Sequence, residues 1–456
     1  FIIDKKKNLL GIVLTHAHED HIGAISHIWP DLKCNIYATP FTAVLIKEKF
    51  KEKNCYLMTQ ASSDLNFSFI VSAEDADKIV ESLHSLCFGG LFKDPVLGET
   101  WHDLYIAPKE DSQLNPYVGF WWYKKARELE ALGKEKSSAY VYRKDIVKER
   151  YSSLDNLEAV KRINFAIKSN PHPKILELLY EKGSCFDCVS LGEVLYLKEL
   201  FPNIDAFRIL FTPNFAPLNE YEKVLKLGCL ITVDNIFLLE KHGSLFQGKE
   251  IFLRLDPGAG RGHHPHVKTA GKNSKFGISP NSFADVLKLV EKYKIKVIGL
   301  HAHAGSGVLD PSSWLHTAKF LAKMAEKFSD VRVLNLGGGL GVPDYPLQKP
   351  LDISLLGEIL SSFSIEHPQF DLWLEPGRYL VAECGVLLAS VTQLKSKEDK
   401  NYIGLSTGMN SLIRPSLYGA YHELVNLSRI HATDFMLADI VGPICETGDV
   451  LGHDRS

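Results

Sequence analysis

The chain has 456 residues, of which 45% are hydrophobic and 23% are charged. This composition is ordinary for a globular protein with a large core, and it excludes a globally disordered chain. With 52 Lys and Arg against 55 Asp and Glu, the net charge is −3, so we expect no nucleic-acid partner. No stretch approaches the roughly 20 apolar residues that span a bilayer, so we expect no membrane partner. Eight cysteines are too few for a disulfide framework, which favours a reducing, cytoplasmic location.

Residues 1–54 combine a buried strand, LLGIVLTH, with a compact set of metal-ligand side chains in THAHEDH. Imidazole and carboxylate groups this close in sequence are typical zinc ligands. The segment resembles the zinc loop of ribonuclease J-type hydrolases of the metallo-β-lactamase fold. The resemblance implies that His16 and His18 hold one zinc ion, and Asp20 and His21 a second. No matching downstream ligands follow, so we expect an inactive fragment; a zinc-dependent hydrolase or ribonuclease is the alternative.

Residues 55–95 predict a strand, LNFSFIVS, and then a helix with acidic residues in its first turn. Together they resemble the end of the regulatory ACT region of an aspartokinase, which implies a piece of a site for an inhibitory amino acid. No kinase sequence precedes it, and a strand and helix without function is the alternative. Residues 96–136 predict a linker with one Lys/Glu-rich helix near its end.

From residue 137 to 380, short apolar strands alternate with amphipathic helices. The eight strand candidates are INFA, CFDC, RILF, CLITV, EIFLR, VIGLH, VRVLN and FDLWL. Repeated strand–helix units require a parallel sheet, and eight of them predict a closed (β/α)8 barrel in the α/β class. We expect small α/β fragments before this barrel, and a β-rich C-terminal domain over residues 381–456 after it. We also expect that domain to be truncated and the chain to be incomplete at both ends.

Polar and glycine residues follow several barrel strands, where the functional residues of such barrels cluster. Lys168 follows the first strand, and an amine partly shielded from water has a lowered pKa and acts as a nucleophile. The consecutive glycines of LGGGLG allow a close approach to an anion. Glu375 in EPGR is placed to hold a protonated ring nitrogen. His301 and His303 lie two residues apart, which leaves a zinc site open as an alternative to stacking on a planar cofactor.

The motifs FAIKSN, DCVSLGE, SKFG, HAHAGSG, LGGGLG, EPGR and GPICETGD occur in one order along residues 137–456. In this order they resemble the fold-type III pyridoxal-phosphate decarboxylases, and among these the diaminopimelate decarboxylases. The ACT-like segment before them is similar to the arrangement in bifunctional aspartokinase/diaminopimelate decarboxylases. The resemblance implies pyridoxal 5′-phosphate as cofactor and decarboxylation of meso-2,6-diaminopimelate to L-lysine; a catalytically dead remnant is a further alternative.

The resemblance also implies a role for each matching residue. Lys168 forms the Schiff base, His303 stacks on the pyridine ring, and Glu375 pairs with its nitrogen. The implied phosphate-binding residues are Ser306, Gly338, Gly339, Gly377 and Arg378. The implied substrate-binding residues are Arg378, Arg414, Tyr418 and Glu446. Cys445 is implied to reprotonate or orient the substrate, and with Glu446 it completes the site of the other subunit in a homodimer with shared active sites.

Overall fold

The structure is a computed structural model, and it describes the chain in part. The described residues are 11–14, 35–38, 62–63, 66–67, 117, 119–258, 274–303, 305–344, 348–398, 400–432 and 436–455. They belong to two compact units, Phe1–Asn115 and Pro116–Ser456. Among the described residues, no helix is both long and apolar enough to cross a bilayer.

The first unit is described only at four short strands. Strands β1 (Gly11–Leu14) and β2 (Asn35–Ala38) pair in parallel, and β3 (Ser62–Ser63) and β4 (Asn66–Phe67) form an antiparallel pair. The first of these lies in the predicted strand LLGIVLTH, and β4 lies in LNFSFIVS. The zinc-ligand candidates His16, His18, Asp20 and His21 lie outside the described residues, as does the helix predicted after β4.

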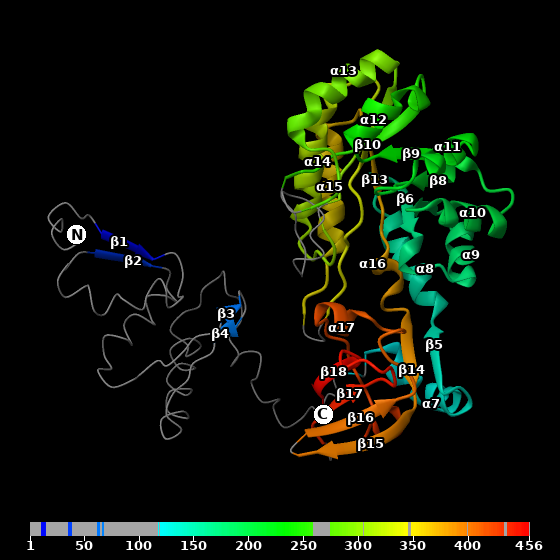
Figure 1. Cartoon of the computed structure of the whole chain (residues 1–456), viewed down its shortest axis with the longest axis vertical. Helices are drawn as coiled ribbons and strands as arrows, with labels where there is room; N and C mark the ends of the chain where they lie inside the picture. Colours follow the sequence, from blue (N-terminus) through cyan, green and yellow to red (C-terminus); the bar gives the residue numbers. More distant parts are fainter. Residues whose placement is uncertain are drawn as a thin grey trace. The chain divides into compact units, whose positions relative to one another are not determined.

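The second unit contains the predicted barrel (Figure 1). Its eight parallel strands close in the order β10-β11-β12-β13-β6-β7-β8-β9. They are β6 (Val160–Ala166), β7 (Cys185–Cys188), β8 (Ile209–Phe211), β9 (Leu230–Val233), β10 (Glu250–Arg254), β11 (Lys296–His301), β12 (Val333–Asn335) and β13 (Asp371–Leu374). Every strand candidate read from the sequence between residues 163 and 374 is a barrel strand, which confirms the fold prediction.

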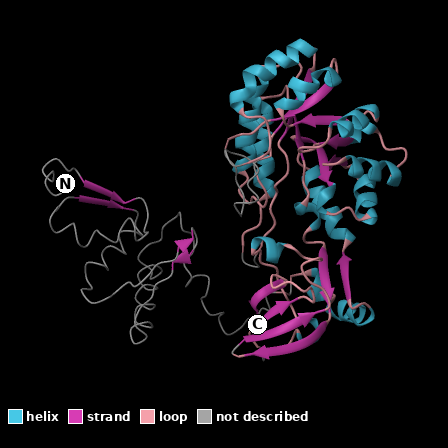
Figure 2. Cartoon of the chain, viewed as in Figure 1, coloured by secondary structure: helices cyan, strands magenta, loops and turns pink. Residues whose placement is uncertain are grey.

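Helices surround the barrel (Figure 2). They are α8 (Lys144–Asp155), α9 (Pro173–Glu181), α10 (Leu191–Leu200), α11 (Leu218–Lys226), α12 (Ile236–His242), α13 (Phe283–Tyr293), α14 (Ser312–Ala325) and α15 (Ile353–Glu366). Local sequence sets several of their starts. The Ser190 hydroxyl accepts a hydrogen bond from the Glu193 amide, and the Glu193 carboxylate accepts one from the Val189 amide. These reciprocal bonds cap the N-terminus of α10.

The barrel core has two apolar layers, because successive residues of a strand point to opposite faces. Residues facing outward pack under the helices in the large cluster of buried side chains. A smaller cluster, which comes from six neighbouring strands, fills the interior. Its members are Leu210, Leu230, Phe252, Ile298, Val333 and Trp373. This apolar plug fills the barrel interior, and the layer above it, at the carboxyl ends of the strands, is where functional residues of such barrels lie.

A β-rich part follows the barrel, as predicted. Strand β5 (Ser138–Tyr142) pairs antiparallel with β14 (Gly385–Ala389), so the strand before the barrel belongs to this part. A four-stranded sheet has the order β15 (Val391–Lys397), β16 (Lys400–Leu405), β17 (Ala438–Val441) and β18 (Val450–Arg455). The short helix α17 (Arg414–Tyr418) packs against β18 in this region, whereas α16 (Arg378–Val381) follows β13 and packs against the barrel helix α8.

The helix predicted near residues 123–136 packs onto the β-rich part. Its two pieces are α6 (Trp121–Lys124) and α7 (Ala126–Glu135), and α7 contacts β14 and the 3-10 turn Leu427–Arg429. The Trp121 indole donates to the Glu383 carbonyl at 2.9 Å. These contacts attach the end of the predicted linker to the second unit.

Candidate active site

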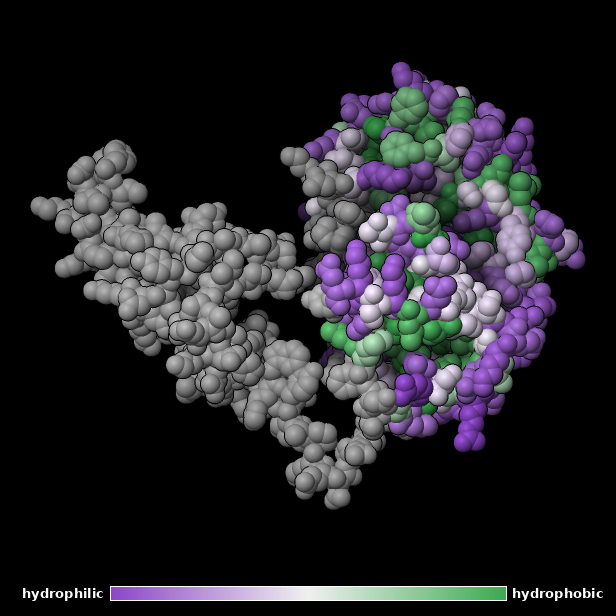
Figure 3. All heavy atoms as spheres, turned by 60° about the horizontal axis from the view of Figure 1, so that its bottom comes forward, coloured by the Kyte–Doolittle hydropathy of each residue, from purple (hydrophilic) through white to green (hydrophobic). Residues whose placement is uncertain are grey.

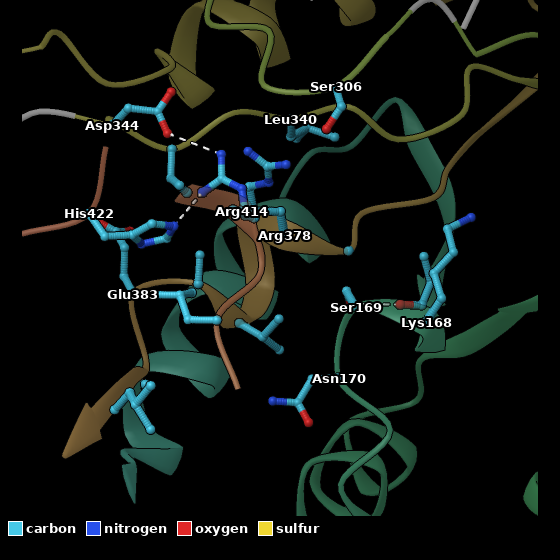
Figure 4. A pocket seen from close by; sticks show the side chains of 18 of the residues that line it. Lys168, Ser169, Asn170, Ser306, Leu340, Asp344, Arg378, Glu383, Arg414 and His422 are labelled. Atoms are coloured by element: carbon cyan, nitrogen blue, oxygen red, sulfur yellow. Dashed lines mark hydrogen bonds and ion pairs between the residues drawn. The ribbon is translucent and has the colours of Figure 1, made fainter. Parts of the chain in front are cut away.

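A cavity of about 1620 Å³ opens between the carboxyl ends of the barrel strands and the β-rich part. Figure 4 shows a part of it. Most of the residues expected from the sequence at the cofactor and substrate sites line this one cavity. They are Lys168, His303, Ser306, Gly338, Gly339, Glu375, Gly377, Arg378 and Arg414.

A polar layer lies directly above the apolar plug, and strand periodicity explains its position. Arg254, Asn335 and Glu375 each lie two residues after an inward-facing member of the plug: Phe252, Val333 and Trp373, respectively. Because the side-chain period of a strand is two residues, these polar groups point into the barrel as well. All three are more than nine-tenths buried.

Lys168 lies in the 3-10 turn Ile167–Ser169 that ends β6, and its Nζ is 3.4 Å from Asp187 Oδ2. Asp187 is buried on β7, where its other oxygen accepts the Thr212 hydroxyl. Burial disfavours the Lys168 ammonium, but the carboxylates of Asp187 and Glu375 outweigh that effect and raise the pKa of Lys168. The expectation of a lowered Lys168 pKa is therefore wrong for the protein without cofactor.

Glu375 is held as a carboxylate by two neighbouring strands. The Asn335 amide donates to Oε1 at 2.7 Å, and His301 Nε2 lies 3.1 Å from Oε2. The latter contact is within ion-pair range. Burial alone would raise the pKa of Glu375, but His301 and, less strongly, Lys168 reverse this and lower the pKa to about 2. An anionic carboxylate in this place fits a partner that carries a protonated ring nitrogen.

The glycine turn after β12 approaches two other strand ends more closely than any side chain permits. Gly337 and Gly339 have φ values of +68° and +86°, which favour glycine. A Cβ on Gly338 would collide with the Glu375 carbonyl, and one on Gly339 with the Gly305 carbonyl. A Cβ on Gly377 would lie 3.1 Å from Ser169 Cβ. This tight backbone cradle fits the phosphate end of a cofactor.

Two amides of this turn are bound to side chains. The Gly337 amide donates to Asn335 Oδ1 at 3.1 Å, and the Gly338 amide donates to His303 Nδ1 at 3.0 Å. Burial, and then the charges of Arg254 and Lys168, lower the pKa of His303 to about 3. His303 is therefore a neutral ring that accepts at Nδ1, which suits stacking on a planar cofactor. His303 accepts from the turn while His301 contacts Glu375, and the described residues contain no metal-ligand cluster.

A second charged cluster lies in the same cavity, where Arg378 and Arg414 meet (Figure 4). Arg414 Nη2 is 3.6 Å from Asp344 Oδ1, and its Nη1 is 3.1 Å from His422 Nε2. Burial, and then the charge of Arg414, lower the pKa of Arg378. The same two causes lower the pKa of His422 to about 4. Two guanidinium groups therefore face one carboxylate and a neutral imidazole, an arrangement that favours a further anion.

Three expected site residues do not line the cavity in this single chain. Tyr418 ends α17, and Cys445 and Glu446 are exposed in the loop between β17 and β18. The Asp449 carboxylate orders that loop by accepting the amides of Met409 and Ile444. The structure thus brings the barrel residues and Arg414 together, and it leaves this loop outside.

Several residues that line or support the cavity were not singled out from the sequence. Arg254 and Asn335 could have been found by counting two residues beyond each inward-facing apolar side chain. Asp344 and His422 lie in irregular segments, where no periodicity marks them. Asp187 lay in a recognised motif, yet its contact with Lys168 depends on the pairing of β6 with β7.

Comparison with known proteins agrees with this geometry. Residues 144–382 match the pyridoxal-dependent decarboxylases over their pyridoxal binding domain. The diaminopimelate decarboxylase of Buchnera aphidicola is 33% identical over 333 residues, which cover 70% of this chain and 78% of that protein. The diaminopimelate decarboxylase of Methanothermobacter thermautotrophicus is 32% identical over 308 residues, which cover 64% of this chain and 71% of that protein.

Solved structures give the same assignment. The diaminopimelate decarboxylase from Helicobacter pylori complexed with L-lysine is 27% identical, with a TM-score of 0.64. The match covers 72% of this chain and 84% of that one. The lysine/ornithine decarboxylase from Vibrio vulnificus, at 21% identity and a TM-score of 0.63, shares the fold. The cradle, the strand-end Lys168 and the buried Glu375 therefore lie in the pyridoxal binding domain of a chain that belongs to the pyridoxal-dependent decarboxylases.

Proposed function

We propose that this chain decarboxylates meso-2,6-diaminopimelate to L-lysine with pyridoxal phosphate as its cofactor. One observation carries the choice of substrate. Lys168 and the pair Arg378 and Arg414 line one cavity but lie apart in it (Figure 4). A substrate with an amino-acid group at each end can place one end near Lys168 and the other carboxylate at the arginines. The relatives named diaminopimelate decarboxylase support the same substrate.

The cofactor seat follows from the residues around Lys168. Lys168 would hold the cofactor through its Nζ, and Asp187, whose Oδ2 lies 3.4 Å away, would accept a proton from that amine. His303 stacks on the ring, Glu375 holds the ring-nitrogen proton, and the phosphate-binding residues are Ser306, Gly338, Gly339, Gly377 and Arg378. The bound cofactor supplies an electron sink for the pair left on Cα when carbon dioxide departs. Glu375 would favour this withdrawal of electrons by keeping the ring nitrogen protonated.

Recognition of the distal end of the substrate is assigned to the arginine cluster. Arg414 binds the distal carboxylate and Arg378 contributes the second positive charge, while Tyr418 and Glu446 bind the remaining polar groups. A planar guanidinium matches a carboxylate with two parallel donors, which a Lys at either position cannot do. This cluster separates a dicarboxylic substrate from lysine and ornithine.

We also propose a cytoplasmic homodimer in which Cys445 and Glu446 complete the site of the other subunit. In that site Cys445 donates the proton that Cα needs after decarboxylation. The β-rich part supports this assembly, since β15 is exposed along its whole length. Apolar side chains gather on the face of this part shown in Figure 3. Its large exposed apolar residues include Val391, Leu394, Ile413, Leu417, Met436 and Leu437.

The N-terminal segments are assigned no part in this reaction. Residues 1–54 are proposed to be a piece like a ribonuclease J-type hydrolase, and residues 55–95 a piece like an aspartokinase ACT region. The boundaries proposed for the remaining chain are 96–136 for the linker, 137–380 for the barrel and 381–456 for the β-rich domain. A zinc-dependent hydrolase in the first segment remains the competing activity.

The decisive experiment supplies the purified chain and pyridoxal phosphate with meso-diaminopimelate, lysine or ornithine, and measures carbon dioxide and amine products. We expect lysine from diaminopimelate and no comparable reaction with the two monocarboxylic amino acids. The Arg414→Leu variant is the matched test, because it should lose turnover of diaminopimelate while still binding the cofactor. Equal or better kcat/KM for lysine or ornithine would contradict the proposed substrate.

A further inference from the structure

Asn335 joins two parts of the cavity that are far apart in sequence. It is fully buried at the end of β12, between His301 on β11 and Trp373 on β13 in the strand register. Its Oδ1 accepts the Gly337 amide at 3.1 Å, and its Nδ2 donates to Glu375 Oε1 at 2.7 Å. One side chain therefore contacts both the glycine turn and the buried carboxylate.

The orientation of this amide is fixed by the chemistry of its two partners. An amide N–H only donates, so the Gly337 contact requires the oxygen of Asn335. A carboxylate oxygen only accepts, so the Glu375 contact requires the nitrogen. Rotating the amide by 180° would place its N–H group against the Gly337 N–H group, and its oxygen against the Glu375 carboxylate. Neither an ionised Asp nor Leu, although similar in size, can make both contacts.

The backbone near Asn335 adds two links between the same parts. The Glu375 amide donates to the Gly337 carbonyl at 2.8 Å, and the Ala302 amide donates to the Asn335 carbonyl at 3.1 Å. The turn, the Glu375 segment and the His301–His303 segment are thus cross-linked around one buried amide. Asn335 thus contributes one contact to the position of the turn and a separate contact to the position of Glu375.

We propose that Asn335 is a positioning residue that keeps the phosphate cradle and the Glu375 carboxylate in one fixed relation, so that both ends of the cofactor bind together. This role rests on the proposed cofactor seat and not on the identity of the substrate. It predicts that phosphate binding and ring binding both depend on residue 335, each through its own contact. Asn335 touches neither the substrate nor the reacting atoms in this role.

The test measures the Kd of the apoenzyme for pyridoxal phosphate and for phosphate-free pyridoxal, with no substrate present. Asn335→Asp keeps the acceptor for Gly337 and loses the donor to Glu375, so both Kd values should rise by the same factor, about tenfold. Asn335→Leu loses both contacts, so the Kd for pyridoxal phosphate should rise about another tenfold while that for pyridoxal rises no further. The ratio of the two Kd values therefore changes in Asn335→Leu alone.

Asn164→Leu is the matched control, because Asn164 is an equally buried barrel-strand amide whose side chain bonds to Arg162 Nε and the Leu374 carbonyl, and to neither the glycine turn nor the Glu375 carboxylate. It should lower the melting temperature without changing the ratio. If Asn335→Leu does not fold, Asn335→Ala removes both contacts without added bulk. An equal rise of the two Kd values in Asn335→Leu or Asn335→Ala, or no rise in Asn335→Asp, overturns the proposal. If the unaltered chain binds neither ligand, the cofactor seat itself is wrong, which separates the two failures.

Discussion

Removing the Asp187 charge should make Lys168 a better nucleophile at neutral pH. The carboxylates of Asp187 and Glu375 are what raise the Lys168 pKa against the opposing effect of burial. In Asp187→Asn the closer of these charges is gone, while the Thr212 hydroxyl keeps an oxygen acceptor. Burial and the nearby Arg254 then lower the Lys168 pKa, so a larger fraction of the amine is neutral at pH 7.

The size of the shift follows from the geometry. At 3.4 Å and an effective dielectric constant of about 20, two unit charges attract by ~5 kcal/mol. The Lys168 side chain is 55% exposed to solvent. Solvent screening therefore reduces the attraction between Lys168 and Asp187 to ~1–2 kcal/mol. Loss of that free energy lowers the pKa of Lys168 and raises the neutral fraction of its amine roughly tenfold at pH 7.

The assay follows the rate at which the apoenzyme takes up pyridoxal phosphate covalently, read from visible absorbance across a range of pH. The midpoint of the pH–rate profile should move to lower pH in Asp187→Asn, and the uptake rate at pH 7 should rise roughly tenfold. Asp234→Asn is the control, since Asp234 pairs with Asn214 rather than with Lys168. An unchanged or higher midpoint in Asp187→Asn would refute the assignment of the raised Lys168 pKa to this ion pair.

Three further outcomes test other parts of the site. Lys168→Ala should lose covalent cofactor uptake and decarboxylation together, and peptide mapping of reduced cofactor to another lysine contradicts this. The pKa of Glu375 is about 2 in the folded protein against an ordinary 4.5. Its carboxylate therefore contributes stability above about pH 4.5 that is lost as the pH falls toward 2, ~3 kcal/mol in full. Urea unfolding should accordingly show a weaker acid dependence in Glu375→Gln. Mixing inactive Lys168→Ala and Cys445→Ala chains should restore some activity, because a mixed dimer contains one intact site; verified subunit exchange without activity disproves the shared site.

The barrel was predictable because its signal is local. Each strand is a short apolar run bounded by polar residues. The run is nearly continuous because the strand is buried on both faces, against the helices outside and against the plug inside. Lys168, His303 and Glu375 were found because each stands in a motif at a strand end. Arg254 and Asn335 carry an equally local signal, two residues beyond Phe252 and Val333, but they stand in no motif that chemistry alone would single out.

The sign of the Lys168 pKa shift could not be read in the same way. Shielding from water lowers the pKa of an amine, and the sequence around Lys168 shows only that shielding. The opposing charge comes from Asp187, nineteen positions further along the chain, and it reaches Lys168 because β6 pairs with β7. Electrostatic effects of this kind depend on the register of neighbouring strands, which is a tertiary property.

The arginine cluster shows how the β-rich part completes a site that the barrel begins. Arg378 follows β13 of the barrel, whereas Arg414 and His422 come from the segment between β16 and β17. Asp344 is the carboxylate that holds Arg414 in this structure, at a distance of 3.6 Å. A substrate carboxylate that approaches Arg414 must compete with Asp344 for it. Because the ion pair is weak at this distance, replacing Asp344 by the substrate costs little free energy. Asp344→Asn should therefore lower the KM for diaminopimelate about two- to fivefold, and an increase in KM would show instead that Asp344 orients Arg414 for binding.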